Sequence, residues 1–158
     1  MKYLLVPTGV ALILAVAGCG PRTTVSPASA TGHEVLLGRF ADDYGIAYLI
    51  TDASWQLGSR DRYRIISWND SARYLVAQNA ESNVENPGKW TRIDWVYLKG
   101  MPPYEWAFCL SEYRASSRAE AEANHSADGM NPRKGCNGYP FSRMRRVPAE
   151  SIAARPYQ

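Results

Sequence analysis

Cysteine and histidine are scarce in this chain, and their scarcity argues against several kinds of chemistry. The 158 residues include three cysteines and two histidines, His33 and His125. Neither histidine has a spacing typical of metal ligands, and no Cys-x-x-Cys pattern occurs. A Gly-x-Ser-x-Gly nucleophile motif and a glycine-rich phosphate loop are also absent. We therefore expect no cofactor, no metal and no catalytic residue, and we do not expect an enzyme.

The chain also lacks an apolar run long enough to cross a membrane as a helix. Its main apolar segment, residues 4–17, is interrupted by Pro-Thr-Gly at residues 7–9, and a spanning helix needs ~20 apolar residues. The segment follows Lys2 and ends in small residues, which is typical of an export signal. We predict a signal peptide at residues 1–18.

The residues Val-Ala-Gly-Cys at 16–19 resemble the lipobox of bacterial lipoproteins. The resemblance covers residues 1–20 and implies cleavage before Cys19, diacylation of its sulfur and acylation of the new N-terminus. Such acyl chains are a stable membrane anchor. Gly20 stands where an aspartate would favour inner-membrane retention, so an outer-membrane location in the bacterial envelope is predicted. The alternative is an ordinary secretory signal with a chance cysteine.

An odd number of cysteines leaves one without a disulfide partner. If Cys19 carries lipid, Cys109 and Cys136 remain, and an exported domain resides where disulfides persist. We predict a disulfide between them, with two free thiols as the alternative.

Composition divides the rest of the chain into a tether and one domain. Residues 20–32 are rich in Pro, Ser, Thr, Ala and Gly and contain little that a core would bury. We therefore expect a lipidated tether at 19–32, a single β-rich domain at 33–147 and a C-terminal tail at 148–158.

Short strand-like segments alternate with turns through the body of the chain. Their spacing predicts an antiparallel meander that closes into a small barrel or a sandwich. One short helix is expected near 118–127, before the last strand, because Ser117 and Glu120 form a capping-box pattern. The predicted strands are 35–40, 46–51, 62–68, 73–79, 90–98, 104–110 and 138–147.

The segments WTRIDW, EWAFC and GCNGYPFSRMRR resemble an uncharacterised family of small exported bacterial proteins with the same two cysteines. This resemblance covers roughly residues 34–147 and implies an exported domain with a Cys109–Cys136 pair, but no activity. The strand order is also similar to that of calycin-type barrels such as lipocalins, which implies a fold and not a function.

Five aromatic residues on neighbouring predicted strands are candidates for a ligand-binding surface. They would line an apolar pocket or stack on a glycan, or alternatively fill the core of the domain. They are Trp90, Trp95, Tyr97, Tyr104 and Trp106.

Charge is unevenly divided along the chain. Residues 32–130 contain ten Lys/Arg and fourteen Asp/Glu, a net charge of −4, whereas residues 131–158 contain six and one, a net charge of +5. Within the basic end, Arg143, Arg145 and Arg146 are candidates for contact with anionic groups of the membrane. The alternative is that they pair with acidic residues of the body, for example Glu105 or Glu112.

Two further charged pairs allow more than one interpretation. Arg92 and Asp94 alternate along one predicted strand, either as an ion pair on the outer face or as a buried pair inside a barrel. Asp42 and Asp43 either bind a cation or stabilise a turn through backbone hydrogen bonds.

Three hypotheses for function follow. The first is an envelope-anchored structural or interaction module, whose partners are the membrane, through Cys19, and an unknown envelope protein. The second is a small β-barrel that binds an apolar or glycan ligand, and the third is an enzyme with an unfamiliar carboxylate site. Nucleic acid is not expected as a partner, because an envelope protein has no obvious access to it.

The lipobox hypothesis is tested by Cys19→Ser, which removes the sulfur that would be acylated. We expect metabolic labelling with a fatty acid to mark the wild-type protein alone, and the variant to be released from the membrane. Equal labelling of both proteins would show that Cys19 is not the lipidated residue.

Overall fold

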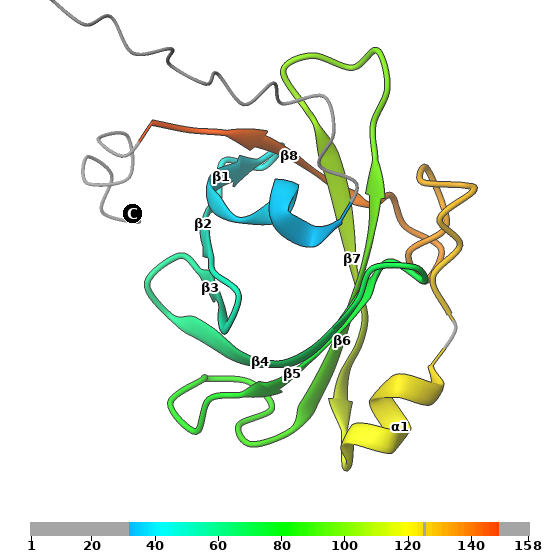
Figure 1. Ribbon diagram of the computed structural model, residues 1–158. Coiled ribbons are helices and arrows are strands. Elements are labelled where there is room, and N and C mark those ends of the chain that lie inside the picture. Colours follow the sequence, from blue (N-terminus) through cyan, green and yellow to red (C-terminus); the bar gives the residue numbers. More distant parts are fainter. Residues whose placement is uncertain (1–31, 125, 149–158) are drawn as a thin grey trace, which may run out of the picture.

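Eight antiparallel strands, each paired with its neighbours in the chain, close into a barrel (Figure 1). The computed structural model describes residues 32–124 and 126–148. A 3-10 helix, η2 (His33–Leu36), precedes the barrel, and the helix α1 (Arg118–Ala123) lies between the last two strands. The strands are β1 (Gly38–Asp42), β2 (Ala47–Ile50), β3 (Ser54–Leu57), β4 (Asp61–Asn69), β5 (Tyr74–Asn79), β6 (Trp90–Tyr97), β7 (Trp106–Ala115) and β8 (Ser142–Arg146).

The prediction of a mainly β meander with one short helix is confirmed, and the sheet closes as a barrel rather than a sandwich. Closure depends on β8, which returns to pair with β1 from Phe40 to Asp42. The signal peptide, Cys19 and most of the predicted tether and tail lie in residues 1–31 and 149–158, outside the described residues.

Three strands differ clearly from the predicted ones, and one strand was missed. One of the three is β7, which runs from Trp106 to Ala115 instead of 104–110. The first predicted strand, 35–40, is divided between η2 and β1. The last strand begins at Ser142 instead of residue 138, because Cys136 and Tyr139 exchange two backbone hydrogen bonds in a turn. Strand β3 was not predicted, since its four residues are too few to show a clear alternation.

Helix α1 begins as predicted but ends four residues early. The side chain of Ser117 accepts a hydrogen bond from the backbone N–H of Glu120, as the capping box requires. Asn124 is already extended, and its side chain accepts a hydrogen bond from the backbone N–H of Ser126, which turns the chain away from the helix axis. Six residues make too short a helix to be stable alone, so α1 depends on its contacts with the barrel.

The barrel interior is filled by aromatic and aliphatic side chains. The ring of Trp55 meets those of Tyr48, Trp106 and Phe108 edge-on, with centroid distances of 6.1, 6.0 and 5.2 Å. Edge-to-face contacts are a favoured arrangement of aromatic rings. An eight-stranded barrel is just wide enough for side chains to fill it. Leu36, Phe40, Ile50, Ile65, Leu75, Ala77, Ile93, Trp95 and Met144 complete this core.

Two segments that connect β7 to β8 cover the outside of the barrel. Helix α1 packs through Ala121 against Val76 and Ala115 on the outer face. The loop that follows is fixed to β7 by a disulfide between Cys109 and Cys136, whose Cα atoms are 5.4 Å apart. The predicted disulfide is therefore present. Cys109 points away from the barrel interior, into a small cluster with Val96, Ala107 and Phe141.

A buried ion pair holds α1 in place. Arg92 binds Asp94 through two hydrogen bonds of 2.9 and 2.8 Å, and also donates to the backbone oxygen of Glu122 at 2.8 Å. Its guanidinium lies 3.8 Å from the ring centroid of Tyr74, and Ser111 donates to Asp94. The pair therefore lies on the outer face, one of the two predicted arrangements, yet it is buried under the helix.

Removing the disulfide with Cys109→Ala and Cys136→Ala should lower the free energy of unfolding by about 3.5 kcal/mol, the loop-closure entropy of a 27-residue separation. Urea unfolding of wild type and variant measures the difference, and reduction of the wild-type protein should reproduce it. An unchanged urea midpoint would contradict this account of the disulfide.

Candidate functional site

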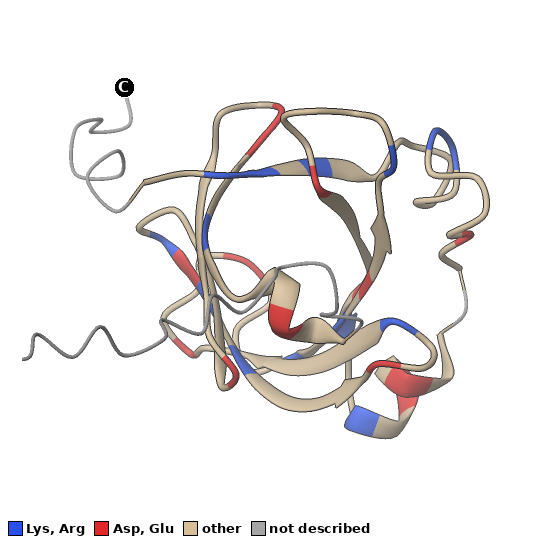
Figure 2. Cartoon of the chain, turned by 45° about the horizontal axis from the view of Figure 1, so that its top comes forward, with Lys and Arg blue, Asp and Glu red and all other residues tan. Residues whose placement is uncertain are grey.

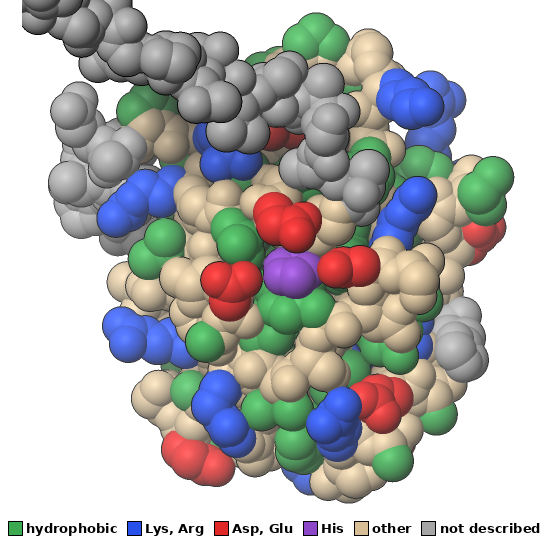
Figure 3. All heavy atoms as spheres, in the orientation of Figure 1, with side chains coloured by type: hydrophobic (Ala, Val, Ile, Leu, Met, Phe, Trp, Pro, Cys, Tyr) green, Lys and Arg blue, Asp and Glu red, His purple; other side chains and the backbone are tan. Residues whose placement is uncertain are grey.

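One end of the barrel is closed by η2. Leu36 is fully buried in the core, and the Tyr97 hydroxyl donates to the backbone oxygen of Gly32 at 2.9 Å. His33 stacks on Trp68 with a centroid distance of 4.3 Å, and its Nδ1 lies 2.9 Å from Asp70. In Figure 3 the histidine stands at the centre of this face, among acidic side chains. At this end η2 therefore covers the barrel interior, and a shallow hollow of about 650 Å³ lies beside it between the β6–β7 connection and Arg146.

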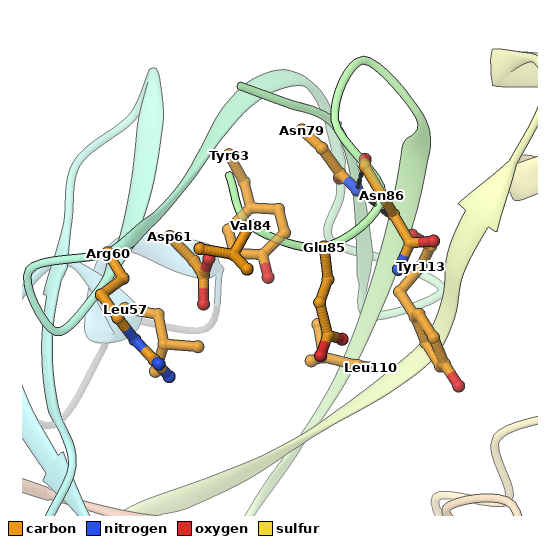
Figure 4. Close-up of a pocket in the computed structure, with 10 residues that line it drawn as sticks. All are labelled: Leu57, Arg60, Asp61, Tyr63, Asn79, Val84, Glu85, Asn86, Leu110 and Tyr113. Atoms are coloured by element: carbon orange, nitrogen blue, oxygen red, sulfur yellow. Dashed lines mark hydrogen bonds between the residues drawn. The ribbon is translucent and has the colours of Figure 1, made fainter. Parts of the chain in front are cut away.

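The opposite end of the barrel carries a cavity of about 350 Å³ (Figure 4). It lies between the β3–β4 turn, the loop from β5 to β6, and strand β7. A volume of about 300–1,000 Å³ is typical of ligand pockets. The lining residues are Leu57, Arg60, Asp61, Tyr63, Asn79, Val84, Glu85, Asn86, Leu110 and Tyr113.

We call this cavity the mouth of the barrel, and its floor is apolar. Leu57, Tyr63 and Leu110 are half-buried and pack against the aromatic core, so the cavity ends where the core begins. At the rim, Val84 is 77% exposed and Tyr113 is 41% exposed. The mouth thus offers apolar surface both at its base and at its edge.

Two carboxylates face the apolar floor. Figure 4 shows Asp61, Tyr63 and Glu85 directed into the same space. Burial, together with the nearby carboxylates of Asp61 and Glu85, raises the pKa of Tyr63 to about 12. Within the described chain, neither carboxylate forms a hydrogen bond or a salt bridge. With Arg60 as the one cation of the lining, the mouth carries an excess of negative charge.

The loop from β5 to β6 holds Glu85 in place through buried amide contacts. The Asn79 side chain donates to the backbone oxygens of Asn86 at 2.8 Å and Tyr113 at 3.2 Å. Its own Oδ1 accepts a hydrogen bond from Thr91 at 2.5 Å. Asn86 has a φ of 52°, which asparagine adopts more readily than most residues. The mouth is therefore built on a loop with defined hydrogen bonds.

The five aromatic residues predicted as a ligand surface lie in separate surroundings. Trp95 and Trp106 are buried in the barrel interior. Trp90 packs on the outer face beside α1, and Tyr97 supports η2. Tyr104 lies under the guanidinium of Arg143, 4.7 Å from its ring centroid. The structure does not bring these residues onto one surface.

The three C-terminal arginines also separate. Arg143 pairs with Asp43 at 2.9 Å, and Arg146 donates to the backbone oxygens of Leu37 and Val35 and lies 3.9 Å from Glu105. Arg145 faces outward beside Ala41 and has no ion-pair partner among the described residues. The pairing alternative therefore describes Arg143 and Arg146, although Asp43 was not the partner named for it.

Of the acidic pair Asp42 and Asp43, Asp42 stabilises the turn between β1 and β2. Asp42 accepts hydrogen bonds from the backbone N–H groups of Tyr44 and Ile46 and from the Tyr48 hydroxyl.

Among the described residues, no group of three or more His, Cys, Asp or Glu is placed to hold a metal ion. No helix in the described ranges is long and apolar enough to span a membrane.

The mouth itself was missed by the sequence analysis. Asp61 begins β4 after a polar turn and Glu85 lies in a polar loop, and both resemble ordinary solvated residues in the sequence, so neither carried a signal. No protein-family model, curated protein sequence or solved structure matches the chain.

Tyr63 should make folding sensitive to alkali. Its pKa is about 12 in the folded protein and about 10 in an unfolded chain, so its contribution to stability is complete below pH 10 and is lost as the pH rises toward 12. In Tyr63→Phe, the fall of the free energy of unfolding above pH 10 should be shallower than in wild type.

Urea unfolding at pH 8, 10 and 11 measures this slope. Tyr139→Phe is the matched control, because Tyr139 is 73% exposed. Burial and Asp42 also raise the pKa of Tyr48, so part of the alkaline loss should persist in Tyr63→Phe. Parallel slopes for wild type and Tyr63→Phe would contradict the prediction.

Proposed function

We propose that this protein is a small-ligand-binding module, held in the bacterial cell envelope by a lipid on Cys19, and that the mouth of its barrel is the binding site. The observation that carries the proposal is the mouth cavity, which combines an apolar floor with two carboxylates that lack a partner in the described chain. The filled interior leaves a ligand the ends of the barrel, and η2 covers the interior at the other end.

The ligand that best complements this mouth is a small organic cation with an apolar body. Its apolar part would cover Leu57 and Leu110, and its charged group would reach Asp61 and Glu85. The Tyr63 ring adds an aromatic face, and cations are attracted to such faces. Arg60 lies on the same rim, and its positive charge would repel a second positive charge on the ligand.

The envelope location rests on the sequence and is supported by the disulfide. Cys109–Cys136 closes a long loop, as is common in domains of oxidising compartments. The lipobox-like residues 16–19 supply the attachment in this proposal.

An interaction role is the second candidate, and it is favoured by a different surface. This is the outer surface of the barrel, where Arg39, Arg62, Arg64 and Arg145 point outward from β1, β4 and β8 and form no salt bridge with a described residue. It does not overlap the mouth, so the two roles are compatible in one molecule.

The mouth can be tested with three probes of similar size: 2-phenylethylamine, 2-phenylethanol and 3-phenylpropionate. We expect the full chain to bind the amine most tightly and the carboxylate least. The combined variant Asp61→Asn and Glu85→Gln should weaken amine binding by roughly three- to tenfold, the scale of partly exposed ion pairs, and leave alcohol binding nearly unchanged. Chemical-shift titration measures each affinity.

Glu105→Gln together with Glu34→Gln is the matched control, since these carboxylates lie at the closed end of the barrel. It should leave the amine affinity unchanged. Equal affinities for the three probes, or equal losses in both double variants, would show that the mouth does not select a cation. Absence of binding by all three would overturn the proposal for this ligand class.

A further inference from the structure

The connection from β6 to β7 presents apolar side chains at the closed end of the barrel. Its eight residues, 98–105, read Leu-Lys-Gly-Met-Pro-Pro-Tyr-Glu, and we call them the apolar hairpin. Met101 is 40% exposed, Pro102 and Pro103 are exposed, and Leu98 and Tyr104 are half-buried. Figure 1 shows the hairpin projecting beyond the ring of strands, and Figure 3 shows hydrophobic side chains at the same upper edge.

The hollow of about 650 Å³ at this end lies between the apolar hairpin and Arg146. The Arg146 guanidinium is held by the backbone oxygens of Leu37 and Val35 and lies 3.9 Å from Glu105. The two charges that line the hollow therefore face each other, and the rest of its lining comes from residues 98–104. The hollow is shallow, so it fits a broad apolar surface better than a small enclosed ligand.

The backbone of the apolar hairpin has few free polar groups. Pro102 and Pro103 have no N–H to donate. The backbone N–H of Tyr104 donates to the oxygen of Met101 at 2.8 Å, and that of Leu98 donates to the oxygen of Glu105 at 2.9 Å. Unsatisfied backbone groups are the main cost of placing a loop in apolar surroundings. This hairpin can therefore enter such surroundings more easily than most loops of its length.

Basic residues flank the hairpin. Lys99 is exposed next to its tip, and Glu105 at its base is the one carboxylate of residues 98–105. Strand β8 pairs with the β7 arm, and Figure 2 shows basic residues along this strand. Arg145 of β8 faces outward and has no ion-pair partner among the described residues. An apolar tip with positive charge beside it complements an anionic membrane, whose phosphate groups lie above its hydrocarbon.

The described chain begins beside this hairpin. The Tyr97 hydroxyl donates to the backbone oxygen of Gly32 at 2.9 Å, and Tyr97 is the last residue of β6. Twelve residues, 20–31, separate Gly32 from Cys19, and at about 3.5 Å per residue they span at most roughly 40 Å. A lipid on Cys19 would therefore hold the closed end near the membrane, whereas the mouth lies at the opposite end.

We propose that the apolar hairpin enters the interface of the lipid membrane to which Cys19 is attached, and that this contact turns the mouth away from the membrane. The inference rests on the lipid attachment in the proposed function. Met101 and the prolines would enter the lipid, and Tyr104 would lie at the headgroups, where tyrosine is enriched. Lys99 would extend its ammonium to the phosphates.

The test uses the mature chain, residues 19–158, which contains every described residue. It carries Cys19→Ser and an N-terminal hexahistidine, which binds a nickel-chelating lipid in vesicles of phosphatidylglycerol and phosphatidylcholine. Met101→Cys supplies a thiol for the fluorophore NBD. Val84→Cys supplies the control label at the mouth, where Val84 is 77% exposed. On vesicles, NBD at residue 101 should emit at shorter wavelength and lose access to the water-soluble reductant dithionite, and NBD at residue 84 should do neither.

A charge in the hairpin should abolish this protection. Pro102→Asp, in the chain labelled at residue 101, should restore access to dithionite, because a carboxylate is costly to remove from water. Met130→Asp is the matched control, because Met130 is 95% exposed on the loop between α1 and β8 and should leave the protection intact. Circular dichroism checks folding. If Pro102→Asp alters the fold, Lys99→Asp replaces it, because Lys99 is exposed.

Four results would overturn the inference. Equal access at residues 101 and 84, or equal effects of Pro102→Asp and Met130→Asp, would show that the hairpin does not enter the membrane. Loss of protection at high salt would indicate a contact through charge alone. Protection only at crowded vesicle surfaces would assign the hairpin to a second copy of the chain. None of these results bears on the anchor, which fatty-acid labelling of Cys19 tests separately.

Discussion

The packing of aromatic rings inside the barrel is the constraint on which the rest of the structure depends. Trp55 contacts three other rings edge-on, and the strands that carry these rings come from both halves of the chain. An eight-stranded barrel has just enough room for such a core, so no internal space remains for a ligand. Function must therefore use the ends of the barrel or its outer surface.

The meander assigns different tasks to the two ends. Successive turns alternate between the ends, so the turns after β2 and β4 meet η2, while the connections after β3 and β5 form the mouth. Residue His33 binds Asp70 at the closed end. At the open end, Asp61 and Glu85 form no hydrogen bond or salt bridge with another residue that the structure describes. A carboxylate thus anchors η2 at the closed end, whereas Asp61 and Glu85 are available to a ligand at the open end.

The outer surface is divided in the same way. On one side, the Arg92–Asp94 pair lies beneath α1, where the hydrogen bonds to Ser111 and to the backbone offset the cost of burying charge. Elsewhere on the outer surface, Arg39, Arg62, Arg64 and Arg145 point outward at different places around the barrel and form no salt bridge with a described residue. Burial with partners makes an arginine structural, and exposure without a carboxylate leaves it available for binding.

The sequence by itself determined the class of fold, the disulfide and the start of the helix. These depend on local alternation, on a count of cysteines and on a capping box of four residues, and each can be seen without knowing the neighbours in space. The function of single side chains was decided only by the tertiary structure. Tyr63 has carboxylate neighbours from two separate segments, the start of β4 and the loop from β5 to β6. Arg143, Arg145 and Arg146 are adjacent in sequence, yet alternation and the closure of β8 onto β1 give them different surroundings. Arg145 instead lies beside Ala41 and diagonal to Arg39, because the pairing of β8 with β1 brings together residues that are far apart in the chain.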